Sequence, residues 1–195
     1  MELPDCLDCK YAEQGHPCRT ADGGFDFAKV GRAVVLHGRT FAKDDDAADF
    51  DAAEREAHAW AGDCAFEVEQ DYPQLLIPLV IAAMDACETS RDAAYVSAGL
   101  LENAVVKHGP LLIGNIEKLA ARSAKFRYFL SAIWGERHTD PAVWARVCKA
   151  VGSSGRMDVD GRTPSDGQPV TVLSEAQVSA LLKERVASTA AALKL

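Results

Sequence analysis

Four residues near the N-terminus could together hold a metal ion: Cys6, Cys9, His16 and Cys18. Structural Zn²⁺ takes four sulfur or imidazole ligands in a tetrahedron, and a Cys-x-x-Cys pair lets two thiolates from one tight turn reach the same ion. The four residues lie within thirteen positions, although the His-x-Cys pair is more closely spaced than in a usual zinc finger. The sequence therefore predicts a structural zinc site in a cysteine-rich knuckle over residues 1–24.

Other arrangements of these cysteines stay open. The thiols could be unligated, or Cys6 and Cys9 could form a redox pair. A redox Cys-x-x-Cys normally opens a helix after a buried strand, however, and no such strand precedes Cys6. Cys64 or His37 could replace His16 as the fourth ligand. A shell of three protein ligands would leave a position open for catalysis, whereas four ligands close it.

The net charge of −8 is concentrated in one stretch of the chain. Asp44–Asp71 holds eleven acidic residues and one basic residue, Arg55, which gives −10, so all other residues sum to +2. Nucleic-acid binding needs a basic face that neutralises phosphates, so direct binding to DNA or RNA is disfavoured. An acidic face favours a protein partner with a basic surface, because complementary charge steers association. The residues expected to contact this partner are Asp44, Asp45, Asp46, Asp51 and Glu54.

The acidic stretch also predicts a long amphipathic helix over Asp44–Gln70. Its apolar residues recur at alternating steps of three and four, at Phe50, Ala53, Ala57, Trp60 and Cys64. The plain alternative to a docking surface is the solvated face of a helix packed on the core. Ala28–Phe41 is ambiguous between strand and helix, and we expect a short helix and loop there. Residues 25–72 thus form a linker segment and an acidic helix.

Residues 73–151 predict a core of short helices. Pro73–Cys87 is apolar around nearly its whole circumference, so this helix should be central. We expect Ser90 to cap a helix through Val96, which Gly99 then ends.

Two further sequence signals mark helix boundaries within this core. His108-Gly109-Pro110 predicts a helix stop and a new start, with Gly109 in the left-handed cap conformation. Phe126–Trp134 predicts another helix, and Asp140 followed by Pro141 begins the next. Helices of two to four turns with tight connections predict an all-α fold, either a compact helical bundle or a short solenoid-like stack.

The C-terminal part, residues 152–195, predicts a loop and one helix. Asp160-Gly161 could turn a small hairpin between residues 157–159 and 170–172. Ser174 with Gln177 forms a capping box for the last helix. The side chains of that helix expected to pack inward are Val178, Leu181, Leu182 and Val186.

A succession of Leu-Glu, His-Gly, Ile-Glu, Phe-Arg, Trp and Val-Trp runs through the core. Its positions are Leu101, Glu102, His108, Gly109, Ile116, Glu117, Phe126, Arg127, Trp134, Val143 and Trp144. This succession resembles DUF6869, a bacterial domain family of unknown function, over roughly residues 73–147. The resemblance implies an all-helical domain and carries no activity.

Residues suited to catalysis are scarce. No Walker loop, G-x-S-x-G elbow, G-x-G-x-x-G or H-E-x-x-H motif occurs. We expect His108 to cap the end of its own helix and Glu117 to pair with Arg122 or Arg127.

Trp134 and Trp144 are expected to be core anchors rather than a ligand cage. Cys87 and Cys148 lie on apolar faces and are expected to be inert buried thiols.

The composition is that of a folded protein, since 48% of the residues are apolar. No apolar run approaches the ~20 residues that span a bilayer, and the acidic N-terminus lacks a signal-peptide core, so we expect a cytoplasmic protein. The sequence favours a non-enzymatic protein that binds another protein, an inhibitor of immunity or anti-defence type such as an anti-CRISPR. The alternatives are a zinc-dependent enzyme that uses the N-terminal cluster, or a structural subunit of a larger assembly.

Overall fold

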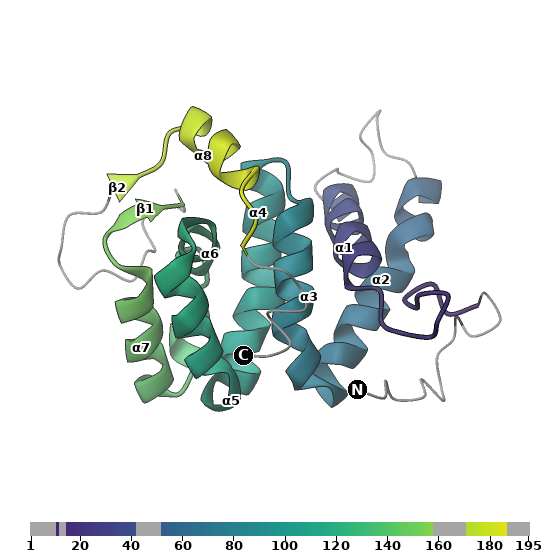
Figure 1. Ribbon diagram of the computed structural model, residues 1–195, viewed down its shortest axis with the longest axis horizontal. Coiled ribbons are helices and arrows are strands. Elements are labelled where there is room, and N and C mark those ends of the chain that lie inside the picture. The colour runs from purple at the N-terminus through teal and green to yellow at the C-terminus, as the bar shows by residue number, and fades with distance from the viewer. Residues whose placement is uncertain (1–10, 12–14, 42–51, 158–170, 187–195) are drawn as a thin grey trace.

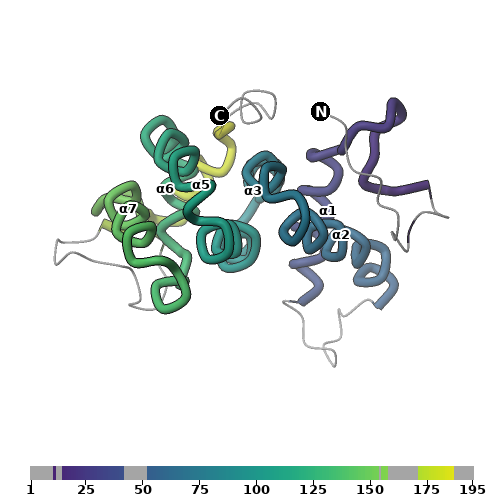
Figure 2. The backbone as a smooth tube through the Cα atoms, turned by 90° about the horizontal axis from the view of Figure 1, so that it is seen from below, coloured from purple at the N-terminus to yellow at the C-terminus, as the bar shows by residue number. Residues whose placement is uncertain are grey.

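The computed structural model describes residues 11, 15–41, 52–157 and 171–186. Within these ranges the molecule is mostly helical, which confirms the predicted all-α class. The helices are α1 (Phe27–Phe41), α2 (Ala52–Asp71), α3 (Pro73–Ala86), α4 (Ser90–Val96), the π-helical turn η2 (Ser97–Leu101), α5 (Glu102–Arg122), α6 (Ala124–Leu130), the 3₁₀ turn η3 (Gly135–His138), α7 (Pro141–Val151) and α8 (Glu175–Leu182). Helices α1 to α7 form a row that runs from α7 at one end to α2 at the other, and α8 lies across one end of α4 and α6 (Figures 1 and 2). No helix in the described ranges is both long and apolar enough to cross a membrane.

Helix α3 lies in the middle of this row, as its apolar sequence predicts. Residues 75–84 are all buried, and the helix packs against α1, α2 and α5. Pro73 at the first turn begins the helix, where the missing N–H costs nothing. The close approach of α1 depends on Gly31, since a Cβ there would stand 2.6 Å from the backbone nitrogen of Ala83. Buried side chains form one continuous apolar core from Cys18 to Leu182.

Helix α2 buries only part of the predicted apolar face. Cys64 is buried and Trp60 packs against the core, as predicted. Its buried residues are Ala61, Cys64, Ala65, Val68 and Glu69. Ala53 and Ala57, placed on the apolar face by the spacing argument, are exposed. Phe50 lies outside the described residues. Helix α1 is continuous to Phe41, without the expected loop, and packs on both α2 and α3.

The connection from α4 to α5 corrects two details. The N-cap of α4 is Thr89 rather than Ser90, and Thr89 forms a capping box with Asp92. Gly99 does not end a helix, because the chain continues through the π-helical turn η2 into α5. The neighbouring Ser97, Leu100 and Leu101 are buried, so packing on the core overrides the glycine's weak helix propensity.

Helix α5 is kinked where the His-Gly-Pro sequence predicts an interruption. The non-helical residue is His108, with φ −124° and ψ 16°, and Gly109 does not take the predicted left-handed conformation. Pro110 accounts for the kink, because it removes an N–H donor and restricts the residues before it. Glycine is required at position 109 because α7 leaves no room for a side chain. A Cβ there would lie 2.7 Å from Val143 Cγ1 of α7.

Helix α6 ends at Leu130, short of the predicted Trp134. Trp134 is 50% exposed and is therefore not the core anchor that its apolar ring predicts, whereas Trp144 is buried. Asp140 caps α7, as expected, by accepting hydrogen bonds from the backbone N–H groups of Ala142 and Val143.

The C-terminal part confirms its helix but not its hairpin. Strands β1 (Ser154–Arg156) and β2 (Thr171–Val172) pair in parallel, whereas a hairpin requires antiparallel strands. Asp160 and Gly161 lie outside the described residues. Helix α8 has the predicted Ser174–Gln177 capping box, and Val178, Leu181 and Leu182 are buried.

Candidate functional site

The segment before α1 lies against α2, at the end of the row (Figure 1). The Tyr11 hydroxyl donates a hydrogen bond to Asp63 Oδ2 at 2.5 Å. Cys18 follows at the start of a tight loop, which is closed by a hydrogen bond from the Asp26 N–H to the Cys18 carbonyl at 2.8 Å. The side chain of Cys18 is buried in the core beside α2.

Cys18 meets Cys64 of α2, a residue that the sequence argument named only as a substitute ligand. A side-chain hydrogen bond with Cys64 is the main reason that the pKa of Cys18 falls to about 7, although burial opposes the shift. The positive charges of Arg19 and Lys29 lower this pKa further. No disulfide joins Cys18 to Cys64. A lowered pKa favours the thiolate, which is the nucleophilic and metal-binding form of cysteine.

The structure does not bring the other predicted zinc ligands to Cys18. Cys6 and Cys9 lie outside the described residues. His16 has a positive φ of 52°, and its buried Nδ1 has no hydrogen-bond partner. Among the described residues no group of three or more His, Cys, Asp or Glu side chains converges to hold a metal ion, so the structure does not bring His16 together with both Cys18 and Cys64.

His37, the other substitute ligand, packs elsewhere. Its ring makes an edge contact with Phe41 at 4.7 Å between centroids and faces Gly62 of α2. Burial lowers the pKa of His37, so the neutral ring is favoured. This histidine fills the interface between α1 and α2.

Cys87 is a buried thiol of a different kind. It donates a hydrogen bond to the Ala83 carbonyl at 3.3 Å within α3, and burial raises its pKa strongly. It is therefore inert at neutral pH, as expected. Cys148 is only partly buried.

The outward face of α2 carries a line of carboxylates. Glu56, Asp63 and Glu67 are exposed, and their spacings of seven and four residues place them on one side of the helix. We refer to these three residues as the acidic stripe. Phe66, which is 58% exposed, stands beside it. Of the residues predicted to contact a partner, Glu54 is exposed, whereas Asp44, Asp45, Asp46 and Asp51 lie outside the described residues.

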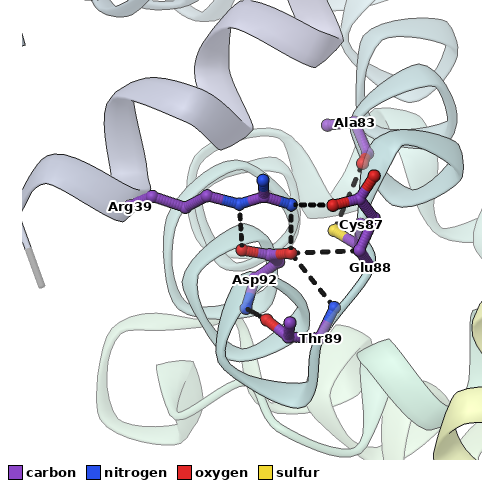
Figure 3. Close-up of polar contacts among 6 residues, drawn as sticks. All are labelled: Arg39, Ala83, Cys87, Glu88, Thr89 and Asp92. Atoms are coloured by element: carbon purple, nitrogen blue, oxygen red, sulfur yellow. Dashed lines mark hydrogen bonds and ion pairs between the residues drawn. The ribbon is translucent and has the colours of Figure 1, made fainter. Parts of the chain in front are cut away.

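A polar cluster holds α1 to the turn between α3 and α4 (Figure 3). The Arg39 guanidinium donates from Nε to Asp92 Oδ1 at 2.9 Å and from Nη2 to Asp92 Oδ2 at 2.8 Å. Arg39 Nη2 also contacts Glu88 Oε2 at 2.8 Å. Asp92 accepts from the backbone N–H groups of Glu88 and Thr89 as well. Although burial opposes its ionisation, these bonds lower the pKa of Asp92, and the cluster is therefore a fixed ion pair rather than an acid or base.

A second polar cluster joins the end of α2 to α5, and the sequence argument missed it. Glu69 is buried, and its carboxylate accepts from Asn103 Nδ2 at 2.6 Å and pairs with Lys107. His108 Nε2 contacts the Glu69 carbonyl at 2.7 Å. His108 therefore binds the last turn of α2, not the end of its own helix as expected. A glutamate in an acidic helix is normally expected to be exposed. Only the apolar residues Ala65 and Val68 nearby indicate that this part of α2 is buried.

A cavity of about 570 Å³ lies between α4, α6 and α8. Tyr128 lines it, and burial raises the pKa of this phenol to about 12. Charged groups at its lining include Glu88, Arg91 and Glu175. The residues described as lining this cavity include no histidine or cysteine. The lining therefore lacks the usual pair of a nucleophile and a histidine base.

The residues of the Leu-Glu to Val-Trp succession serve mainly to hold the helices together. Glu102 accepts a hydrogen bond from the Trp134 backbone N–H at 2.6 Å. Glu117 forms a bidentate ion pair with Arg146 of α7, and not with Arg122 or Arg127. Arg146 donates from Nε to Glu117 Oε1 at 2.9 Å and from Nη2 to Glu117 Oε2 at 2.6 Å. The apolar members that are buried are Leu101, Ile116, Phe126, Val143 and Trp144.

Comparison with known families agrees with the resemblance that this succession carries. The chain belongs to the DUF6869 family. The family, described as one of unknown function, matches residues 48–154, a wider range than the resemblance covers. The match spans α2 to the start of β1, so Cys64 lies within it and Cys18 lies before it. No curated protein and no solved structure matches the chain.

Proposed function

We propose that this DUF6869 protein acts in the cytoplasm by binding a protein partner with a basic surface, without catalysing a reaction. The observation that carries the proposal is the acidic stripe with exposed Phe66 on the outward face of α2. Carboxylates supply complementary charge, and an aromatic side chain beside them supplies apolar contact area. The free thiols of the described cysteines suit a reducing compartment.

The charge distribution supports one face of contact rather than a generally acidic surface. Asp44–Asp71 carries −10 and the remaining residues sum to +2. A basic partner would therefore be steered to the end of the row that α2 occupies. The exposed Glu54 is a further candidate for this contact, and so are Asp44, Asp45, Asp46 and Asp51, which lie outside the described residues. The protein class that fits is an inhibitor of immunity or anti-defence type, such as an anti-CRISPR, which covers a basic groove of its target.

We further propose a structural zinc ion held by the N-terminal cluster, with Cys6, Cys9, His16 and Cys18 as the first candidates for its ligands. The thiolate tendency of Cys18 supports this assignment, since zinc binds deprotonated thiols. Such an ion would fix the N-terminal segment against α2, beside the acidic stripe. A shell of four protein ligands is closed, so this zinc supports binding and not catalysis.

Capture of partners from a bacterial lysate tests the proposal. The full chain is immobilised, and bound proteins are eluted by a step from low to high salt. We expect a basic protein that binds at low salt and elutes when salt screens the acidic face. Recovery of no specific partner at either salt concentration would overturn the proposal.

A further inference from the structure

We propose that the cavity between α4, α6 and α8 is a binding site for a small, neutral and mainly apolar molecule that carries a carbonyl oxygen. Its volume of about 570 Å³ lies within the range of ligand pockets. The site contains none of the residues of the acidic stripe, so this inference does not depend on the proposed function. A molecule bound there would contact three helices that are distant in sequence.

The surface of the cavity is more apolar than polar. Three of its apolar residues, Met157, Val178 and Leu182, are buried parts of the core. Apolar walls favour an apolar ligand, because binding removes the surfaces of both from water. The apolar residues described in the lining are Ala94, Tyr128, Met157, Leu173, Val178 and Leu182.

The Tyr128 hydroxyl is a polar group within this lining that has no partner. Tyr128 is 1% exposed, and its hydroxyl makes no hydrogen bond with the residues that the structure describes. The other polar residues described in the lining are exposed. A buried hydroxyl without a partner is costly, so the missing partner must enter through the cavity as water or as a ligand. Because burial raises its pKa to about 12, this phenol stays protonated at neutral pH and can donate to a carbonyl oxygen.

The charges at the edge of the cavity favour a neutral ligand. The charged residues described there are Glu88, Arg91 and Glu175, and all three are exposed. Glu88 is paired with Arg39 of α1 at 2.8 Å. The charges of Arg91 and Glu175 are opposite and sum to zero. The edge therefore gives neither an anion nor a cation a clear advantage.

Two walls of the cavity are fastened by polar contacts, so the space exists before a ligand binds. Thr89 and Asp92 form the capping box that fixes the start of α4 (Figure 3). On the opposite side, the Leu182 carbonyl at the end of α8 accepts a hydrogen bond from the buried Lys125 ammonium at 2.8 Å. A site formed in advance loses less conformational freedom when its ligand binds.

Nile red is a suitable probe, because it is neutral and mainly apolar, carries a ring carbonyl and fluoresces strongly only in apolar surroundings. The full chain is titrated with Nile red, and the dissociation constant is measured for wild type and Tyr128→Phe. Ala94→Phe and Ser179→Trp place large side chains in the cavity, and Ser179 is exposed, so its variant should fold. Tyr95→Phe is the matched control, since Tyr95 follows Ala94 on α4 but is not among the described lining residues. Urea unfolding of each protein is measured in parallel.

We expect the wild-type chain to bind Nile red at a single saturable site. Tyr128→Phe should bind ~3–10-fold more weakly, which corresponds to one hydrogen bond between neutral groups. Ala94→Phe and Ser179→Trp should lose saturable binding because their side chains occupy the space, and Tyr95→Phe should match wild type. The free energy of unfolding of Tyr128→Phe should stay close to that of wild type, since the hydroxyl has no hydrogen bond to the described residues that it could lose.

Four results would overturn the inference. The first is the absence of saturable binding to wild type. The second is unchanged affinity in a cavity-filling variant that stays folded, which would place the probe elsewhere on the protein. Equal affinity of Tyr128→Phe and wild type would show that the hydroxyl does not bind the carbonyl. A larger loss of unfolding free energy in Tyr128→Phe than in Tyr95→Phe would show that this hydroxyl already has a partner within the protein.

Discussion

At the scale of single residues, three buried charged side chains, Asp92, Glu69 and Lys125, have their hydrogen-bond partners in place. Asp92 accepts from Arg39 and two backbone amides, and Glu69 accepts from Asn103 and Lys107. Lys125, which is fully buried, donates to two backbone carbonyls and contacts a carboxylate. Such groups stabilise the fold only as complete sets, because a buried partner left alone costs its full desolvation.

Replacing Asp92 with Asn should destabilise the protein by about 1–3 kcal/mol at pH 7, the usual worth of hydrogen bonds to a charged group. The folded pKa of Asp92 lies below its usual 3.8, so the stabilisation is present above pH 3.8. It is lost as the pH falls below that value toward the folded pKa. Urea unfolding of both proteins at pH 7 and near pH 3 measures this.

The gap between wild type and Asp92→Asn should therefore shrink at the lower pH. Glu117→Gln is the control, since it weakens an exposed ion pair and should change stability far less. An equal gap at both pH values would mean that the charge of Asp92 does not contribute.

Lys125→Met should release α8 from the core. The Lys125 ammonium donates to the carbonyls of Leu182 and Glu184 at 2.8 Å each and lies 3.3 Å from Asp85, so it fixes the end of α8. Its loss leaves these carbonyls without their donor, at a cost of about 1–3 kcal/mol. Amide hydrogen exchange should accelerate across α8 and stay slow in α3.

Lys149→Met, on the exposed side of α7, is the control for this experiment and should leave the exchange of α8 unchanged. Unchanged exchange of α8 in Lys125→Met would show that its apolar residues alone hold the helix.

At the scale of elements, the sequence predicts what depends on local signals. The apolar circumference of α3, the Ser174–Gln177 box of α8 and the Asp140 cap of α7 are all present. Each of these signals acts within one helix, so no knowledge of neighbouring helices is needed to recognise it.

The features that sequence analysis misplaced depend on neighbours in space. Helix α2 packs against α1 and α3 and buries Cys64 and Val68 in its second half, whereas Ala53 and Ala57, on the same side near its N-terminal end, are exposed. Glu117 pairs with an arginine of α7 rather than one nearby in sequence. The parallel pairing of β1 and β2 likewise follows from tertiary packing and has no local turn signal.

The crossing of α1 and α3 provides a test at this scale. Gly31→Ala should destabilise the protein by about 1–3 kcal/mol or more, because a Cβ would stand 2.6–2.7 Å from the backbone of Ala82 and Ala83, which cannot easily move. Gly114→Ala in α5 meets no atom within 4 Å and should instead stabilise by about 0.5–1 kcal/mol. Urea unfolding of the two variants should move the midpoint in opposite directions, and equal shifts would contradict the packing described for Gly31.

At the scale of the whole molecule, the proposed contact surface lies at one end of the row of helices. The family match covers α2 to the start of β1. The acidic stripe and the segment that contains Cys18 lie at the α2 end of the row (Figure 1). The sequence predicts an acidic surface, and the carboxylates of the acidic stripe are exposed, whereas the zinc ligands stay a prediction. It could not place Cys64 beside Cys18, because that contact joins segments distant in sequence.

The binding proposal predicts that charge on one helix face controls partner capture. Glu56→Gln/Glu67→Gln removes two charges from the acidic stripe, and Glu136→Gln/Glu184→Gln removes two exposed charges elsewhere. Both variants have the same net charge, so any difference between them reports position rather than total charge. Phe66→Ala tests the apolar part of the same surface.

The most direct measurement is the affinity of these variants for the partner captured at low salt. We predict that Glu56→Gln/Glu67→Gln binds at least ~10-fold more weakly than wild type, as loss of about 1.4 kcal/mol implies, and depends less on salt. Glu136→Gln/Glu184→Gln should bind as wild type does. Equal affinity of the two double variants would contradict the proposal that α2 is the docking surface.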